Sequence, residues 1–170
     1  FIENKSNIFI KNLEIASHVA NDIFNDSNFP NLNGDLLINC LESFKMPPGR
    51  GEIFSLNKFK IIDDSYNANP ESVKAALDHL SGYKENRKFF VFGDMKELGA
   101  NEEIFHKKIG QYAVEKADIL LTVGKLAKNA QSNSNNFALS LHFNDNFSLL
   151  EKLTELLTDG DIILIKGSRS

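Results

Sequence analysis

Apolar positions follow a helical spacing in the first part of this chain. In the rest, apolar runs of strand length alternate with stretches of helical spacing. Residues 7–24 carry apolar positions at i, i+3, i+4 and i+7, which predicts an amphipathic helix. A polar, Asn-rich connector follows, and Asp35 is placed to cap a second short helix. The apolar positions of the two helices are Ala16, Val19, Ala20 and Ile23, then Leu37, Ile38, Leu41 and Phe44.

The run Met46-Pro47-Pro48-Gly49 separates these two parts. Proline cannot continue a helix and glycine allows a sharp turn, so the helical part ends at this run. We place a domain boundary there, with residues 1–47 in one domain and residues 48–170 in another.

After the boundary, apolar runs of strand length alternate with amphipathic helical segments. Strands are expected at 52–56, 59–64, 88–92, 118–123, 137–143 and 161–165. Four helices are expected. One begins at Pro70, one spans residues 102–116, a short one follows residue 124 and the last follows residue 143. The inward positions of the first two are Val73, Ala76, Leu77 and Leu80, then Phe105, Ile109, Tyr112 and Ala113. The last helix is Leu-rich, with Leu149, Leu150, Leu153, Leu156 and Leu157. The alternation predicts an α/β fold, a mostly parallel open sheet flanked by helices and preceded by a short helical segment. The Ser/Asn-rich run 131–136 is typical of a surface loop.

Composition narrows the class of protein. The 170 residues are 42% hydrophobic and 25% charged, which is ordinary for a globular protein. A net charge of -4 argues against a nucleic-acid partner. The single cysteine, Cys40, excludes an internal disulfide framework and fits a reducing compartment such as the cytoplasm. No apolar run approaches the roughly 20 residues that span a bilayer. The chain starts at Phe1 and stops soon after an apolar strand, so we expect it to be a fragment of a longer protein.

The stretch 61–70 holds the densest group of polar side chains at a strand end. It starts as an apolar strand, continues as Asp63-Asp64-Ser65-Tyr66-Asn67 and ends with Asn69-Pro70, a good helix cap and first helical residue. A capped helix without a ligand would explain Asn69, but not Asp64, Tyr66 and Asn67 together. A carboxylate at the carboxyl end of a strand is well placed to hydrogen-bond a ribose.

Three further segments end at the same predicted sheet edge. Gly93-Asp94 presents a carboxylate one strand along from Asp64, and its alternative is an ordinary turn. Val123-Gly124-Lys125 lacks the spacing of a P-loop and is interpreted as an ordinary turn. Lys166, Ser168 and Arg169 suit a carboxylate or phosphate, and their alternative is a solvated basic end. At the domain junction, Arg50 suits either a salt bridge or a nucleotide phosphate.

Histidine and cysteine contribute no site of their own. The four histidines show no metal-ligand spacing, and His79 and His106 are expected on helix surfaces. Cys40 is expected to be a small buried hydrophobic residue.

Four motifs together resemble the Mur ligases, and within that family the branch that adds D-alanyl-D-alanine to a UDP-muramoyl tripeptide. They are Pro48-Gly49-Arg50, Asp64-Ser65-Tyr66-Asn67-Ala68-Asn69-Pro70-Glu71-Ser72, Phe92-Gly93-Asp94-Met95-Lys96-Glu97-Leu98-Gly99 and Lys166-Gly167-Ser168-Arg169-Ser170. They occur in the family's order and cover its Rossmann-like C-terminal domain. Residues 12–16 resemble the last part of the family's central ATP domain, with Phe9 where the family has an Asn near the adenine.

The resemblance implies a three-domain enzyme that uses ATP and Mg²⁺, with the P-loop and the magnesium ligands in the central domain and no metal site in this chain. Arg50 would contact an ATP phosphate and Asp64 the ribose. Tyr66, Asn67 and Asn69 would form the wall between nucleotide and dipeptide, with Asn67 on the nucleotide side. Asp94, Lys166, Ser168 and Arg169 would lie near the incoming D-Ala-D-Ala.

The implied reaction forms an amide through an acyl phosphate of UDP-N-acetylmuramoyl-tripeptide, a step of peptidoglycan synthesis. We expect a monomer without a transmembrane segment, and no catalysis by these 170 residues alone. The open alternatives are a sister ligase with another amino-acid acceptor, a non-catalytic nucleotide-binding module and a structural domain with a vestigial site.

Overall fold

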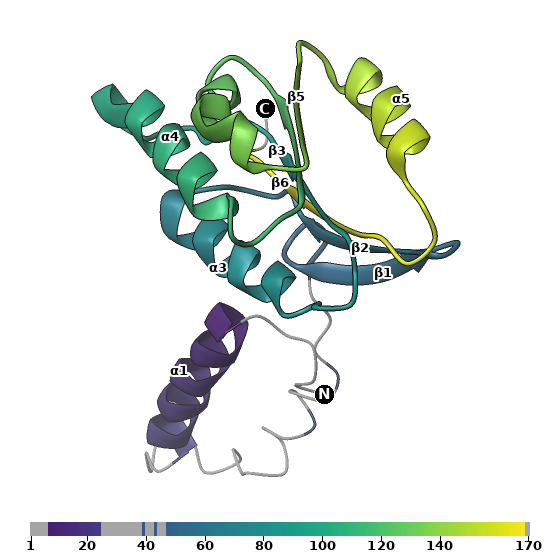
Figure 1. Cartoon of the computed structure of the whole chain (residues 1–170). Coiled ribbons are helices and arrows are strands. Elements are labelled where there is room, and N and C mark those ends of the chain that lie inside the picture. The colour runs from purple at the N-terminus through teal and green to yellow at the C-terminus, as the bar shows by residue number, and fades with distance from the viewer. Residues whose placement is uncertain (1–6, 25–38, 40–42, 44–46, 169–170) are drawn as a thin grey trace. The chain divides into compact units, whose positions relative to one another are not determined.

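The computed structural model describes residues 7–24, 39, 43 and 47–168 (Figure 1). The chain divides into two compact units, 1–46 and 47–170. In the first unit, α1 (Asn7–Phe24) is the helix predicted from the apolar spacing. Val19 and Ile23, two of its apolar residues, are 53% and 39% exposed. The expected second helix and Cys40 lie outside the described residues.

The second unit is built on one six-stranded sheet. Its strands are β1 (Glu52–Leu56), β2 (Phe59–Asp64), β3 (Lys88–Phe92), β4 (Ile119–Val123), β5 (Leu139–Phe143) and β6 (Ile162–Lys166). They lie in the order β1-β2-β6-β3-β4-β5, and only the β1–β2 hairpin pair is antiparallel. The predicted α/β class and mostly parallel sheet are confirmed. The last strand lies in the middle of the sheet, so β6 separates β2 from β3.

Helices cover both faces of the sheet (Figure 1). The helical elements are α3 (Pro70–Ser81), η1 (Gly99–Asn101), α4 (Glu102–Ala113), η2 (Ala127–Asn136) and α5 (Asn146–Leu156). One core contains the inward residues of α3, α4 and η2 together with Phe90, Phe92 and Leu164 from the strands. The second core joins Leu149 and Leu153 of α5 to the opposite sheet face. Phe89 to Phe92 are all buried, as expected for a strand that is covered on both faces.

Two expectations from the sequence are wrong. The Ser/Asn-rich run belongs to the 3-10 helical turns of η2 rather than to a loop. His106 was expected on the surface and is fully buried, since it lies in phase with Ile109, Gly110 and Ala113 of α4.

The amino ends of β3 and β6 are joined by a partly buried ion pair. The Arg87 guanidinium donates to both carboxylate oxygens of Asp161, at 3.0 and 2.6 Å, and also to the carbonyl of Leu156. Burial by itself raises the pKa of Asp161, but the bonds from Arg87 and from the backbone of Thr158 outweigh it. The pKa of Asp161 therefore lies below its usual value.

Replacing Arg87 with alanine is expected to lower the free energy of unfolding by about 2–3 kcal/mol at pH 7, because it leaves the nearly buried Asp161 carboxylate unpaired. A carboxylate with a depressed pKa stabilises the fold above its unfolded pKa of about 3.9, and that contribution is lost as the pH falls. The difference between the two proteins in urea unfolding should therefore shrink below pH 4. A difference that stays constant from pH 7 to pH 3 would contradict this account. Lys84→Ala, on an exposed residue nearby in sequence, is the control.

Candidate functional site

The central position of β6 determines which side chains meet at the carboxyl edge of the sheet. Parallel pairing places Asp64 of β2 directly opposite Lys166 of β6, and Lys166 opposite Phe92 of β3. Paired residues in neighbouring strands present their side chains on the same face. Asp64 and Lys166 therefore face one another, while Asp94 follows β3 and is separated from Asp64 by the whole of β6 rather than being one strand along.

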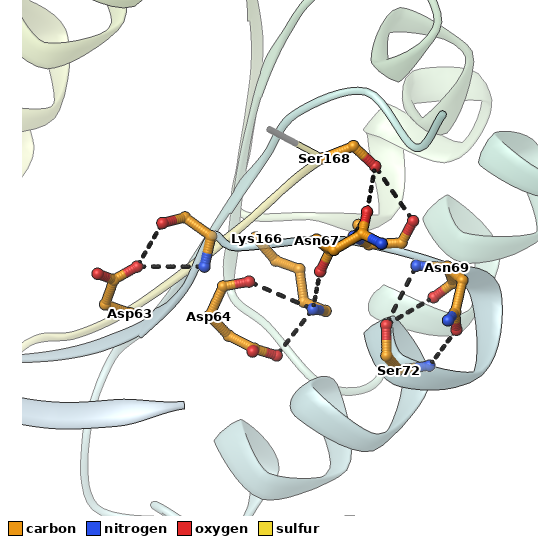
Figure 2. A network of polar contacts seen from close by, with 9 residues as sticks. Asp63, Asp64, Asn67, Asn69, Ser72, Lys166 and Ser168 are labelled. Atoms are coloured by element: carbon orange, nitrogen blue, oxygen red, sulfur yellow. Dashed lines mark hydrogen bonds and ion pairs between the residues drawn. The ribbon is translucent and has the colours of Figure 1, made fainter. Parts of the chain in front are cut away.

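Lys166 reaches from β6 into the loop that follows β2 (Figure 2). Its Nζ lies 2.8 Å from Asp64 Oδ2 and donates to the carbonyl oxygens of Asp64 at 3.2 Å and Asn67 at 2.7 Å. The Lys166 side chain is 1% exposed and that of Asp64 is 23% exposed. Lys166 was expected beside a substrate, but its ammonium group lies inside a closed network.

Burial is the largest influence on the ionisation of both partners. It raises the pKa of Asp64, against the opposing attraction of Lys166. It lowers the pKa of Lys166, against the opposing attraction of Asp64. The Arg50 guanidinium is close enough to lower both pKa values as a smaller contribution. The site therefore combines a half-buried carboxylate with two cations.

The loop between β2 and α3 is held by its own side chains (Figure 2). Asp63 Oδ1 accepts from the amide of Ser65 at 3.1 Å and from its hydroxyl at 2.6 Å. Asn69 caps α3 and Pro70 lies in its first turn, as the sequence predicts. Ser72 completes a reciprocal capping box with Asn69. The Asn69 side-chain oxygen is thus used by the helix cap.

Arg50 and Tyr66 form the exposed wall of the site. The guanidinium carbon of Arg50 lies 3.9 Å from the centre of the Tyr66 ring, a cation–π contact, and the ring is 43% exposed. The amide of Tyr66 donates to the carbonyl of Gly49 at 2.9 Å. Gly49 has a φ of +75°, and a Cβ there would lie 3.0 Å from Tyr66 N, so this close approach requires glycine. Arg50 therefore packs against the loop that carries Asp64.

Ser168 joins three segments at the sheet edge. Its hydroxyl donates to the amide oxygen of Asn67 at 3.0 Å or the carbonyl of Ala68 at 3.2 Å, and accepts from the backbone amide of Lys96 at 3.0 Å. The amide of Ser168 donates to the carbonyl of Asp94 at 2.8 Å. The Asn67 amide oxygen also accepts from the amide of Ala68 at 2.8 Å. These bonds connect the ends of β2, β3 and β6.

One oxygen of the Asp94 carboxylate is bound by the turn after β4. Its Oδ1 accepts from the amides of Leu126 at 2.9 Å and Ala127 at 2.7 Å, at the start of η2. Gly124 has a φ of +109°, and a Cβ there would lie 2.5 Å from Asp94 Oδ1. The Val123-Gly124-Lys125 turn thus packs against this carboxylate, and Gly124 leaves the space that it occupies.

His106 supports the same edge from beneath, and our sequence reasoning missed it. Its Nε2 accepts from the amide of Met95 at 2.9 Å, so Nδ1 carries the proton and donates to the carbonyl of Glu102 at 2.6 Å. This neutral histidine fixes the segment directly after Asp94. The signal was available, because His106 falls on the apolar stripe of α4.

Three further expectations concern Arg169, a metal site and a membrane span. Arg169 lies outside the described residues. Across the described residues, no three His, Cys, Asp or Glu side chains gather in a way that could hold a metal ion. Of the described helices, none is both long and apolar enough to cross a membrane.

Comparison with known proteins identifies the family of this chain. The sequence model of the family described as Mur ligase, glutamate ligase domain, matches residues 49–169. The chain belongs to the Mur ligase family. The match spans the sheet, both helical layers and the four motifs except for Pro48 and Ser170 at their outer ends.

Several curated relatives of this chain share one particular ligase name. UDP-N-acetylmuramoyl-tripeptide--D-alanyl-D-alanine ligase of Bacillus subtilis is 41% identical over 117 residues, which are 64% of this chain and 25% of that protein. The structure of MurF from Acinetobacter baumannii superposes with a TM-score of 0.74 at 28% identity, covering 81% of this chain and 31% of that one. MurF ligase from Thermotoga maritima, solved in complex with ADP, gives a TM-score of 0.67 at 28% identity, covering 78% and 30%. This Mur ligase chain spans between a quarter and a third of the length of these proteins.

Proposed function

We propose that this chain is part of an ATP-dependent ligase that joins D-alanyl-D-alanine to UDP-N-acetylmuramoyl-tripeptide in the cytoplasm, a step in making peptidoglycan precursors. The observation that carries the proposal is the half-buried Asp64 carboxylate, held by Lys166 beside the Arg50–Tyr66 pair. It lies at the carboxyl edge of a parallel sheet, where α/β folds bind ligands. The relatives that bear this ligase name and the MurF structure with ADP support the substrates.

In this proposal residues 1–47 are the end of a central ATP domain and residues 48–170 are the C-terminal domain. The carboxylate of the tripeptide attacks the γ-phosphorus of ATP, which releases ADP and leaves an acyl phosphate. The amine of D-Ala-D-Ala then attacks the acyl carbon, and inorganic phosphate leaves as the amide forms. No covalent bond to the protein is needed, so the chain's residues act by positioning and by charge.

Geometry supports a specific division of roles for the nucleotide. Asp64 Oδ2 is held by Lys166, and the other carboxylate oxygen is assigned to the ribose hydroxyls. Arg50 is assigned to a phosphate, which its exposed guanidinium can reach by leaving the face of Tyr66. Asn67, fixed by Ala68 and Ser168, shapes the nucleotide side of the wall.

The dipeptide is assigned to the other side of the wall. Tyr66 supplies an exposed ring, and Asn69 lies at the start of α3. Asp94, Ser168 and Arg169 complete this side in the proposal, with Asp94 able to offer the carboxylate oxygen that does not cap η2. ATP is used with Mg²⁺, whose ligands we assign to the central domain of the family, and no role for these residues is derived through the metal.

The test is a ligation assay with the full-length protein that carries this sequence. With ATP, Mg²⁺ and UDP-N-acetylmuramoyl-tripeptide, D-Ala-D-Ala is expected to release phosphate and form the pentapeptide product. Single amino acids offered as acceptors should give at least about 100-fold lower kcat/KM, because a site that hydrogen-bonds a dipeptide leaves polar groups unpaired with a smaller acceptor. Preference for a single amino acid would identify a sister ligase. ADP binding without ligation of any acceptor would favour a nucleotide-binding module.

A further inference from the structure

Lys166 has used its full bonding capacity inside the protein. An ammonium group has three N–H donors, and three acceptors surround Nζ: Asp64 Oδ2, the carbonyl of Asp64 and the carbonyl of Asn67. The side chain is 1% exposed. A substrate that bound this ammonium would have to displace one of these buried partners and leave it unsatisfied.

The three contacts fix the loop at two separate points. One carbonyl belongs to Asp64, at the end of β2, and the other to Asn67, three residues further on (Figure 2). Together they bracket Tyr66, whose amide donates to the carbonyl of Gly49. The backbone path that carries both Asp64 and Tyr66 is therefore set from β6.

The same contacts orient the Asp64 carboxylate. Lys166 binds Oδ2, whereas Asp64 Oδ1 takes part in none of the hydrogen bonds or ion pairs among the described residues. Rotation of the carboxylate is restricted by the ion pair and by the direct pairing of residues 64 and 166 in the sheet. Lys166 therefore fixes Oδ2 of Asp64, and Oδ1 is available to a ligand.

We propose that Lys166 is a positioning residue for the nucleotide side of the site, which orients Asp64 and the 64–67 backbone and contacts neither the dipeptide nor a phosphate. The inference rests on the proposed function, because it assigns Asp64 to the nucleotide. It sets Lys166 apart from the neighbouring Ser168, although the two lie in one short motif. Arginine is not an adequate replacement, since its planar fork cannot direct three donors to acceptors grouped around one atom.

The experiment is a double-mutant cycle in the full-length ligase with Lys166→Met, Asp64→Asn and both together. Methionine keeps the unbranched apolar stem, and the double variant removes both charges at once. Lys166→Met is expected to raise the Kd of ADP about 10-fold and to leave the KM of D-Ala-D-Ala within about 2-fold. In the Asp64→Asn background the same change should raise the Kd of ADP by less than about 3-fold, because the partner that Lys166 orients is already altered.

Three results would overturn the inference. A rise in the dipeptide KM with an unchanged Kd of ADP would make Lys166 a dipeptide ligand. Equal effects of Lys166→Met on ADP binding in both backgrounds would mean that it does not act through Asp64. A merely structural lysine would weaken ADP and dipeptide binding together, which the comparison of the two constants detects.

The ADP measurement separates this inference from the proposed function. If the wild-type enzyme uses another acceptor, the proposed substrate is wrong but the ADP cycle still tests Lys166. If the wild-type enzyme binds no ADP, the proposed function fails, and the cycle is then measured by urea unfolding without ligand. Strong non-additivity there would support the positioning of Asp64 by Lys166, and additive effects would overturn it.

Discussion

Asp64→Ala in the full-length ligase is expected to lower kcat/KM for ATP by at least about 100-fold, which corresponds to roughly 3 kcal/mol of transition-state stabilisation. In the proposed role of Asp64, the substitution removes a charged acceptor from the nucleotide. It also leaves the buried Lys166 ammonium without its counter-ion. Steady-state kinetics at varied ATP give the value. Asp64→Asn, which keeps the shape and removes the charge, should lose most of the same activity.

Asp63→Ala is the matched control for this loss. Asp63 is the adjacent carboxylate, and it binds the amide and hydroxyl of Ser65 rather than Lys166. Its removal loses these two exposed hydrogen bonds, and it should cost less than about 5-fold in kcat/KM because the net energy of exposed hydrogen bonds is small. Near-normal turnover by Asp64→Ala, or equal losses in the two variants, would show that Asp64 does not serve the nucleotide.

Gly110→Ala is expected to destabilise the fold by about 3 kcal/mol, although alanine is the better helix former by about 1 kcal/mol. Gly110 lies in α4 where η2 crosses it. A Cβ at this position would lie 1.9 Å from the carbonyl oxygen of Ala130 and 2.6 Å from its carbonyl carbon. Both atoms are backbone, so the whole of η2 must move away from α4 to relieve the overlap.

Urea unfolding of the 170-residue chain measures this effect. The control is Gln111→Ala, at the exposed neighbouring position of the same helix, which should change the free energy of unfolding by less than about 0.5 kcal/mol. An unchanged or increased stability of Gly110→Ala would mean that the two helices separate without cost. The prediction does not depend on the proposed activity.

Local features of the fold could be predicted because their causes are local. Every described strand of the sheet coincides with an apolar run, and the Asn69-Pro70 start of α3 follows from capping chemistry alone. Strand order could not be predicted in this way, since parallel neighbours share no turn and leave no signal in the sequence between them. The insertion of β6 between β2 and β3 is therefore known only from the structure.

The candidate site divides along the same line. Asp64, Tyr66 and Arg50 were identified by residue type and position, and they lie together at one edge. The burial of Lys166 was missed, because a lysine in Lys-Gly-Ser after an apolar strand is typical of a solvated end. Its phase did carry the information: Ile162, Leu164 and Lys166 alternate onto the same face of β6, and the first two are core residues.

The central strand is also the last of the six described strands in the order of synthesis. A nascent chain that ends at residue 160 holds β2 and β3 but not the strand that pairs with both of them. Their inner edges stay unpaired until Ile162 to Lys166 leave the ribosome, and such open edges are sites for wrong pairing between chains. Completion of the sheet then coincides with the arrival of Lys166 opposite Asp64. Closure of this six-stranded sheet and assembly of the candidate site are thus the same folding step.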